Sequence, residues 1–183
     1  MKKIVIALLS LVMITTAYAQ VEKQQYDKAI ARLREAKSEL ERFYALDRAA
    51  KASVNIGNKQ EAKQLAEELQ GLMQKYRDDW NYGNVVQDVN IVLGRIAVSE
   101  GRIEDAKKHL LEAGKSPGSP QMDSFGPNMT LAKDLLEKGE KDVVIQYFEL
   151  CSKFWEMDSG KLKQWTQQVR DGQIPDFGPN LLY

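Results

Sequence analysis

Side chains that commonly carry catalysis are scarce in this chain. It has one histidine, His109, and one cysteine, Cys151, so it cannot assemble the His- and Cys-rich sites that zinc favours. His109 follows Lys107 and Lys108 on the polar side of a predicted helix, where we expect an exposed imidazole. The sequence contains neither a Gly-rich phosphate loop nor a Ser nucleophile elbow. We therefore nominate no catalytic residue, no metal ligand and no cofactor, and we expect a protein that is not an enzyme.

Acidic residues are the remaining candidates for chemistry. The pairs Glu67-Glu68, Asp78-Asp79 and Glu104-Asp105 lack the alternating spacing of a calcium-binding loop. Glycoside hydrolysis needs only two facing carboxyl groups and no sequence motif. A small carboxylate-dependent hydrolase acting on cell-wall glycan is therefore kept as an alternative function.

Three basic residues each stand six positions before a glycine and directly after a small residue. The cations are Lys51, Arg95 and Lys133, and the glycines are Gly57, Gly101 and Gly139. One helical turn after the cations come Asn55, Ser99 and Glu137. These six residues could line a groove, where the cations would bind carboxylates of an acidic peptide through charge-assisted hydrogen bonds. The alternative interpretation is that the cations are ordinary solvated charges.

The same glycines lie between amphipathic stretches. Five positions after them stand the small or β-branched residues Ala62, Ala106 and Val144. This recurrence predicts helical hairpins stacked side by side.

The central hairpin carries Leu93-Gly94, Gly101, Ala106, Leu110 and Ala113. It resembles a tetratricopeptide repeat, in which small residues let two helices cross closely. The turn glycines are 44 and 38 residues apart, whereas that family repeats at ~34 residues. The resemblance implies that the first helices line an inner groove, and the three cations would then form a row along it.

Apolar residues at helical spacing predict an all-α domain over residues 20–172, and no stretch alternates with period two. We expect a solenoid of stacked antiparallel hairpins, about three, plus a C-terminal helix closed by Gly172. The first stripe begins at Tyr26 and either runs on as one long helix or breaks near Asp47. Four residues are expected in the core, and they are Cys151, Phe154, Trp155 and Trp165. We expect Trp80 to lie in a loop packed under a hairpin.

Two segments are predicted to be irregular. One is the Pro/Gly/Ser-rich connection 115–126, and the other is the tail 173–183. The tail is apolar, so we expect it to fold back onto the domain and bury Phe177. Phe-Gly-Pro-Asn occurs at 125–128 and again at 177–180, which we interpret as a shared turn that buries the Phe. Residues 115–183 also look similar to the C-terminal part of an uncharacterised group of exported bacterial proteins, to which no activity is attached.

The N-terminus resembles a bacterial signal peptide. Lys2 and Lys3 precede a short apolar run, and Ala17-Tyr18-Ala19 offers a cleavage site before Gln20. Removing residues 1–19 leaves 24 basic and 26 acidic side chains, a formal charge of −2. That balance argues against nucleic acid and against anionic membrane surfaces as partners. We expect a periplasmic or secreted protein with no transmembrane anchor after signal cleavage.

These features together favour a binding protein over an enzyme. We expect an exported helical-repeat adaptor that binds a protein or peptide, with acidic groups on the partner. The alternatives are the carboxylate-dependent hydrolase and a structural subunit of an envelope assembly.

Overall fold

The computed structural model describes the backbone of residues 2–182 and the side chains of residues 19–182. The predicted signal peptide, residues 1–19, therefore lies almost wholly outside the described side chains. The described chain is 71% helix and contains no strand, which confirms the all-α prediction. Its helices, in chain order, are α1 (Lys2–Glu35), α2 (Glu39–Asn55), α3 (Lys59–Leu72), α4 (Tyr82–Ser99), α5 (Ile103–Gly114), α6 (Pro120–Phe125), α7 (Thr130–Leu136), α8 (Lys141–Cys151) and α9 (Lys161–Arg170), with a 3₁₀ turn at Gly178–Leu181.

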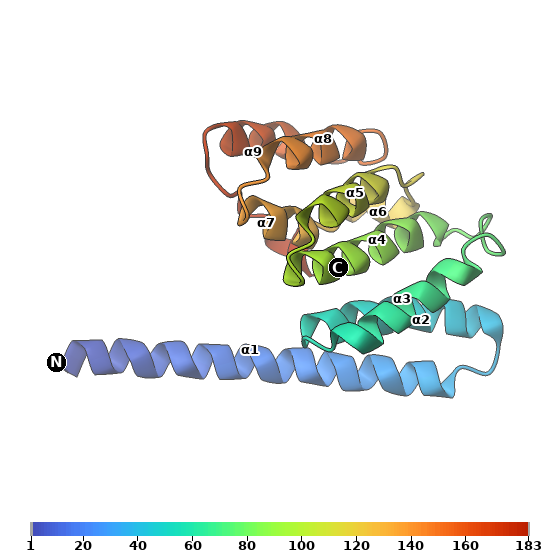
Figure 1. Cartoon of the computed structure of the whole chain (residues 1–183), viewed down its shortest axis with the longest axis horizontal. Coiled ribbons are helices and arrows are strands. Elements are labelled where there is room, and N and C mark those ends of the chain that lie inside the picture. Colours follow the sequence, from blue (N-terminus) through green and yellow to red (C-terminus); the bar gives the residue numbers. More distant parts are fainter. Residues whose placement is uncertain (1, 183) are drawn as a thin grey trace.

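The helices lie in successive layers from α1 and α2 at one end to α8 and α9 at the other (Figure 1). Within the described residues, no helix combines the length and the apolar composition needed to cross a bilayer.

Three turns of one kind connect α2 to α3, α4 to α5 and α7 to α8. Gly57, Gly101 and Gly139 all have positive φ, at 81°, 75° and 87°, a conformation that glycine adopts without a Cβ penalty. At each turn the N–H after the glycine bonds a carbonyl five residues back, as Arg102 N to Ala97 O at 2.9 Å illustrates. This is the Schellman pattern that ends a helix. The predicted turn glycines therefore do end the first helix of each pair.

The break after the first helix is not where the sequence suggested. The chain leaves α1 at Ala36, and Ser38 caps the start of α2 by accepting a hydrogen bond from Glu41 N at 3.2 Å. The helix α2 then passes through Asp47 without interruption. Both alternatives weighed for this stretch were therefore wrong, because the side-chain cap at Ser38 starts a new helix within a stretch whose apolar stripe looks continuous.

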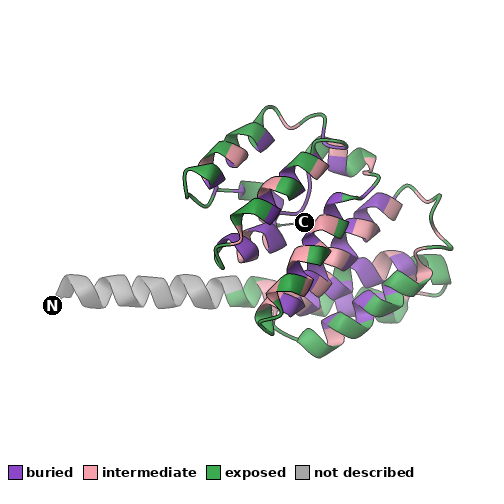
Figure 2. Ribbon diagram, turned by 45° about the horizontal axis from the view of Figure 1, so that its top comes forward, coloured by how far each residue is buried: buried purple, intermediate pink, exposed green. Residues whose placement is uncertain are grey.

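The core consists of two clusters that share α4. One lies among α1, α2, α3 and α4, and the other extends from α4 to α9 and the tail. In Figure 2 the buried residues line the faces between adjacent helices. Cys151, Phe154, Trp155 and Trp165 all lie in the second cluster, as predicted. Gly94 marks the close crossing on α4, since a Cβ there would stand 2.3 Å from Leu131 Cδ2.

The segment 115–126 is more regular than predicted, because Ser119 and Pro120 start the short helix α6. Ser119 Oγ accepts a hydrogen bond from Met122 N at 3.0 Å. Proline is favoured at the first helical position, where its missing N–H has no intrahelical partner to lose.

The tail returns to the domain, and Phe177 is buried against Trp165 with ring centroids 5.0 Å apart. The burial expected for Phe177 is confirmed. The two Phe-Gly-Pro-Asn copies meet there, because Asn180 Nδ2 donates to Phe125 O at 3.0 Å and to Pro127 O at 2.9 Å. The interpretation that both copies bury their Phe was wrong, since Phe125 is 56% exposed. The second copy supplies the contacts that hold the first in place.

Candidate functional site

A cavity of about 960 Å³ opens between the N-terminal helices and the middle of the domain. One wall comes from α1 and α2, and the other comes from the start of α4, from α6 and from the first Phe-Gly-Pro-Asn turn. The lining positions on α1 include Gln25, Lys28, Arg32 and Glu35, which recur every three or four residues. One face of α1 therefore points to the cavity, while Ile30 and Leu33 on another face are buried in the core.

The helical wall of the cavity carries charges of both signs, with Glu35 and Glu41 beside three exposed cations. Lys28 and Arg32 stand one turn apart on α1, and Arg48 lines the cavity from α2. All three are exposed, and the described residues offer them no ion pair or hydrogen bond. They are available to an anionic group entering the cavity.

Exposed aromatic side chains also line the cavity. Trp80 is 60% exposed, and its ring stacks on Tyr44 with centroids 6.1 Å apart. The Tyr44 hydroxyl donates to Asp79 Oδ2 at 2.7 Å, which holds the pair in place. Phe125 also lines the cavity. The expectation that Trp80 packs under a hairpin was wrong, because Tyr44 supports one face of its ring and leaves the rest open to the cavity and solvent.

The floor of the cavity carries two acids and one lysine. Lys51 Nζ lies 2.7 Å from Asp88 Oδ2 and 3.4 Å from Asp47 Oδ2. Asp47 and Asp88 are only 8% and 6% exposed. The second Asp47 oxygen, Oδ1, is buried and has no hydrogen-bond partner among the described atoms.

Burial dominates the electrostatics of this cluster. It raises the pKa of Asp88 to about 7, against the lowering effect of Lys51, and the neighbouring Asp47 adds to the rise. Burial alone lowers the pKa of Lys51, but the charges of Asp47 and Asp88 outweigh it and the net pKa is raised. Lys51 therefore stays charged, while Asp88 gains or loses its proton near neutral pH.

An amide network joins this floor to the second core. Gln87 Oε1 accepts from Asn128 N at 2.9 Å, and Gln87 Nε2 donates to the Tyr147 hydroxyl oxygen at 3.1 Å. The Tyr147 hydroxyl in turn donates to Asn128 O at 2.8 Å. Burial raises the pKa of Tyr147 well above its usual value, so this donor stays protonated. The network fixes the first Phe-Gly-Pro-Asn turn against α4 and α8.

Two of the three predicted cations form ion pairs between helices of the protein. Lys51 pairs with Asp47 and Asp88, as above, and Arg95 Nε bonds Asp134 Oδ2 on α7 at 3.0 Å. Arg95 Nη1 also donates to Asn55 Oδ1 on α2 at 2.6 Å. Lys51 and Arg95 thus each pair with an acid on the next helix of the row formed by α2, α4 and α7.

The remaining predicted site residues make local contacts. Lys133 forms an ion pair with Glu137 one turn along its own helix. Ser99 Oγ donates to Ile96 O at 2.7 Å. Of the six predicted residues, Lys51 and Asn55 line the cavity, whereas Arg95, Ser99, Lys133 and Glu137 are outside its lining.

His109 is half-buried rather than exposed. Its Nδ1 lies 2.9 Å from Asn90 Oδ1, and burial lowers the pKa of the imidazole. The sequence interpretation was wrong because Gly94 lets α5 approach α4 closely, which covers part of a helix face that looks polar. Across residues 19–182, no group of three or more His, Cys, Asp or Glu side chains is arranged to hold a metal ion.

Sequence reasoning missed most of the cavity. The polar stripe Gln25, Lys28, Arg32 and Glu35 could have indicated a second functional face on α1, since it recurs at helical spacing beside the apolar stripe. Nothing local in the sequence indicates that Asp88 of α4 would share a cavity with that stripe, because this arrangement depends on how the helices stack. Comparison of this chain with protein families, with curated proteins and with solved structures gives no match.

Proposed function

We propose that this chain is an exported helical-repeat protein, with hairpins stacked in the tetratricopeptide-like manner, that binds an extended peptide in the cavity beside α1 and α2. The three equivalent glycine turns and the cation–acid pairs between successive first helices support the stacking. The observation that carries the binding proposal is the cavity itself, whose lining combines unpaired exposed cations with the exposed aromatic rings of Trp80 and Phe125.

The chemistry of the cavity lining defines the peptide. Lys28, Arg32 and Arg48 suit a glutamate or aspartate, because charge-assisted hydrogen bonds to guanidinium and ammonium groups are strong. Trp80 and Phe125 suit an apolar side chain, since aromatic rings bury a large area at little cost in conformational freedom. The acidic partner expected from the sequence is retained, but its carboxylates are assigned to these three cations. Lys51 and Arg95 already hold acids of the protein.

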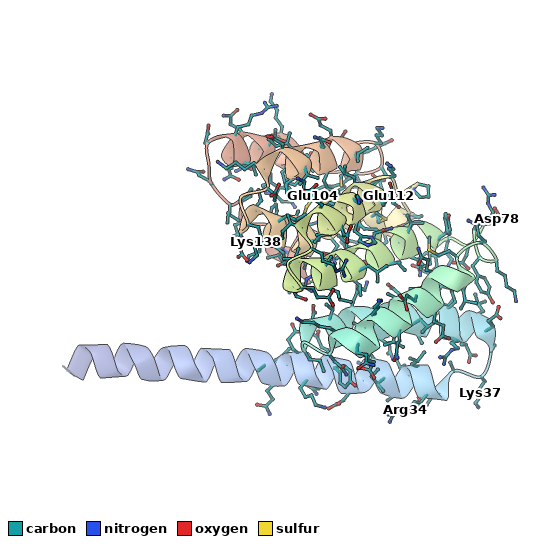
Figure 3. The ribbon with its side chains drawn as sticks, viewed as in Figure 1. Arg34, Lys37, Asp78, Glu104, Glu112 and Lys138 are labelled. Carbon is teal, nitrogen blue, oxygen red and sulfur yellow. The ribbon has the colours of Figure 1, made fainter. Side chains whose placement is uncertain are left out.

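A matched pair of charge reversals tests the proposal on the mature chain, residues 20–183. The probes are a six-residue peptide with two glutamates flanking a phenylalanine and a counterpart with lysines in place of glutamates. Binding is measured by calorimetry and by protection of Trp80 from acrylamide quenching. Arg48→Glu should lower the affinity for the acidic peptide by about tenfold or more. Arg34→Glu should not, because Arg34 points away from the domain (Figure 3) and lies outside the cavity lining.

Equal effects of the two reversals, or equal binding of the acidic and basic peptides, would contradict the proposed site. Raising the salt concentration should lower the affinity for the acidic peptide, since exposed charges are screened within about 8 Å at physiological ionic strength.

The hydrolase alternative has less support. Its mechanism needs two carboxyl groups with a glycosidic bond between them. Asp47 and Asp88 are the buried carboxyls of the cavity, but Lys51 Nζ contacts both and fills the space where the bond would lie. No other observation favours this activity.

A further inference from the structure

One acceptor oxygen at the floor of the cavity has no hydrogen-bond donor. Asp47 lines the cavity and is more than nine-tenths buried, yet its Oδ1 receives no hydrogen bond from the described chain. A buried carboxylate oxygen without a donor is unfavourable, because it has lost its hydration and gained no hydrogen bond in exchange. Within the chain, only the proton that a neutral Asp88 shares with Asp47 can serve as this donor. When Asp88 is ionised, the donor has to come from a group that enters the cavity.

The charge of the cluster indicates which kind of donor fits. Asp47 and Asp88 share a single cation, Lys51, at 3.4 and 2.7 Å. With both acids ionised, one negative charge is in excess at a site largely shielded from water. A neutral donor would supply the hydrogen bond to Asp47 Oδ1 but would leave the excess negative charge. A cation would supply the hydrogen bond and also neutralise the charge.

We propose that Asp47 and Asp88 form a subsite for a primary ammonium group, which donates to Asp47 and balances the excess negative charge that Lys51 leaves. This rests on the proposed function, because the ammonium would belong to the bound peptide, either as its N-terminus or as a lysine side chain. The ammonium lies at the floor while the peptide's acidic group meets Lys28, Arg32 and Arg48 at the wall.

Proton exchange gives this subsite a defined pH dependence. The empty cluster relieves its excess charge by protonating Asp88, whose pKa is raised to about 7 by burial and by Asp47. A bound ammonium favours the ionised form, so protons compete with it. Affinity for an ammonium should therefore fall as the pH drops, by roughly fivefold from pH 7 to pH 6 and by nearly tenfold for the next unit, as expected for one proton.

The surrounding charges come from several helices. Asp88 on α4 is acted on by Asp47 and Lys51 of α2, and its charge in turn affects Tyr147 of α8. The helix α1 contributes Lys28, Arg32 and Glu35 to the same cavity, and α2 contributes Glu41 and Arg48. Lysine, arginine and tyrosine keep their protonation state between pH 5 and pH 7. Asp88, whose pKa is raised to about 7, is therefore the group expected to set the pH response in that range.

Small ammonium probes test the subsite without any peptide ligand. The mature chain is labelled with ¹³C at the aspartate carboxyl carbons and titrated with glycinamide, which carries an α-ammonium, and with Nα-acetyl-lysine amide, which carries a side-chain ammonium. N-acetylglycinamide is the neutral control. We expect saturable shifts of the Asp47 and Asp88 signals with at least one ammonium, weaker at pH 6 than at pH 7, and no such shift with the control.

Two variants complete the test. Asp47→Asn should lose the ammonium response, whereas Asp78→Asn should keep it, because Asp78 lies on an exposed loop at the edge of the domain (Figure 3) and outside the cavity lining. If Asp47→Asn does not fold, the comparison of charged and neutral probes in the unmodified chain still tests the subsite.

Three results would overturn the subsite and leave water as the partner of Asp47. They are the absence of a saturable shift, an equal response to N-acetylglycinamide, and an affinity that does not fall below pH 7. Peptide binding through Arg48 could survive any of these results, so the two proposals fail separately.

Discussion

At the scale of single residues, the chain places its most perturbed acid where two helices meet. Asp88 is buried on α4 and contacts Lys51 of α2, yet its pKa is raised to about 7. Loss of hydration therefore outweighs the attraction of the lysine, a balance known for buried ion pairs.

This balance predicts how Asp88 contributes to stability across the pH scale. Its pKa is near 3.9 in the unfolded chain and about 7 in the folded protein, so the folded state holds the extra proton between these values. The contribution of Asp88 to stability is therefore largest below about pH 4 and falls as the pH rises to about 7, by at most ~1.4 kcal/mol per unit.

Thermal melts of the mature chain and of Asp88→Asn from pH 4 to pH 8 isolate this contribution, because other titrating groups are common to both proteins. We expect the wild type to lose stability relative to the variant up to about pH 7 and to change little above it. A difference that grows in the opposite direction would mean that Lys51 stabilises ionised Asp88 more than burial destabilises it.

At the scale of secondary-structure elements, close approach of backbones decides how the cavity wall is placed. A Cβ on Gly83, in the first turn of α4, would stand 1.8 Å from the carbonyl oxygen of Gly118. Ser116 Oγ also donates to Gly83 O at 2.7 Å. The loop that leads into α6 is thus held directly against the start of α4, and α6 carries Phe125 to the rim.

Gly83→Ala should accordingly destabilise the protein by ~1–3 kcal/mol, since the clash is with backbone and not with the end of a flexible side chain. Gly71→Ala is the matched control, because a Cβ on Gly71 in α3 meets nothing within 4 Å. That change should be neutral or should stabilise by about 0.5–1 kcal/mol, through the lower chain entropy of alanine. Chemical denaturation of both variants measures the free energy of unfolding. Equal effects would show that the close approach of Gly83 to Gly118 does not contribute to stability.

The tail acts on the same wall. Asn180 is 1% exposed and donates to the carbonyl oxygens of Phe125 and Pro127. Asn180→Ala leaves these carbonyls without that donor, which should cost ~1–3 kcal/mol. Gln173→Ala, on an exposed residue of the same tail, should cost little. Limited proteolysis with melting curves is the measurement, and an Asn180→Ala tail as resistant as the wild type would argue against this anchoring role.

At the scale of the whole molecule, two clusters of buried residues share α4, and the cavity lies where the first cluster meets the start of the second half. Its walls belong to segments far apart in the chain, since α1 and the turn at 126–128 face each other across it. A ligand bound there would contact both halves of the stack.

The predicted export of the protein is tested on the full chain. Expression in a bacterial host followed by cell fractionation should place it in the periplasm or the medium, with Gln20 as the first residue of the mature form. N-terminal sequencing and intact mass give the cleavage site. An uncleaved product that stays in the cytoplasm would contradict the signal-peptide assignment.

Local features of the fold could be predicted from the sequence because they depend on neighbouring residues. Gly57, Gly101 and Gly139 indicate turns that need positive φ, and the apolar stripes indicate helices. The cap at Ser38 was within reach by the same reasoning, since Glu41 follows three residues later.

The candidate site was less predictable. Lys51, Arg95 and Lys133 share a register, but register does not reveal whether an acid stands opposite. Asp88 is 37 residues from Lys51 in the chain, and Asp134 is 39 residues from Arg95. The position of each acid depends on the crossing of two helices, so solvated cations and paired cations give the same sequence pattern.

The sequence by itself therefore determined the helical class, the glycine turns and the apolar faces, because these follow from backbone conformation and from the period of the helix. Only the tertiary structure decided which polar faces meet. It paired Lys51 with Asp88, left Arg48 unpaired at the cavity and brought Asn180 to the first Phe-Gly-Pro-Asn turn. Such pairings depend on the distance and angle between stacked helices, which side chains distributed along the whole chain set together.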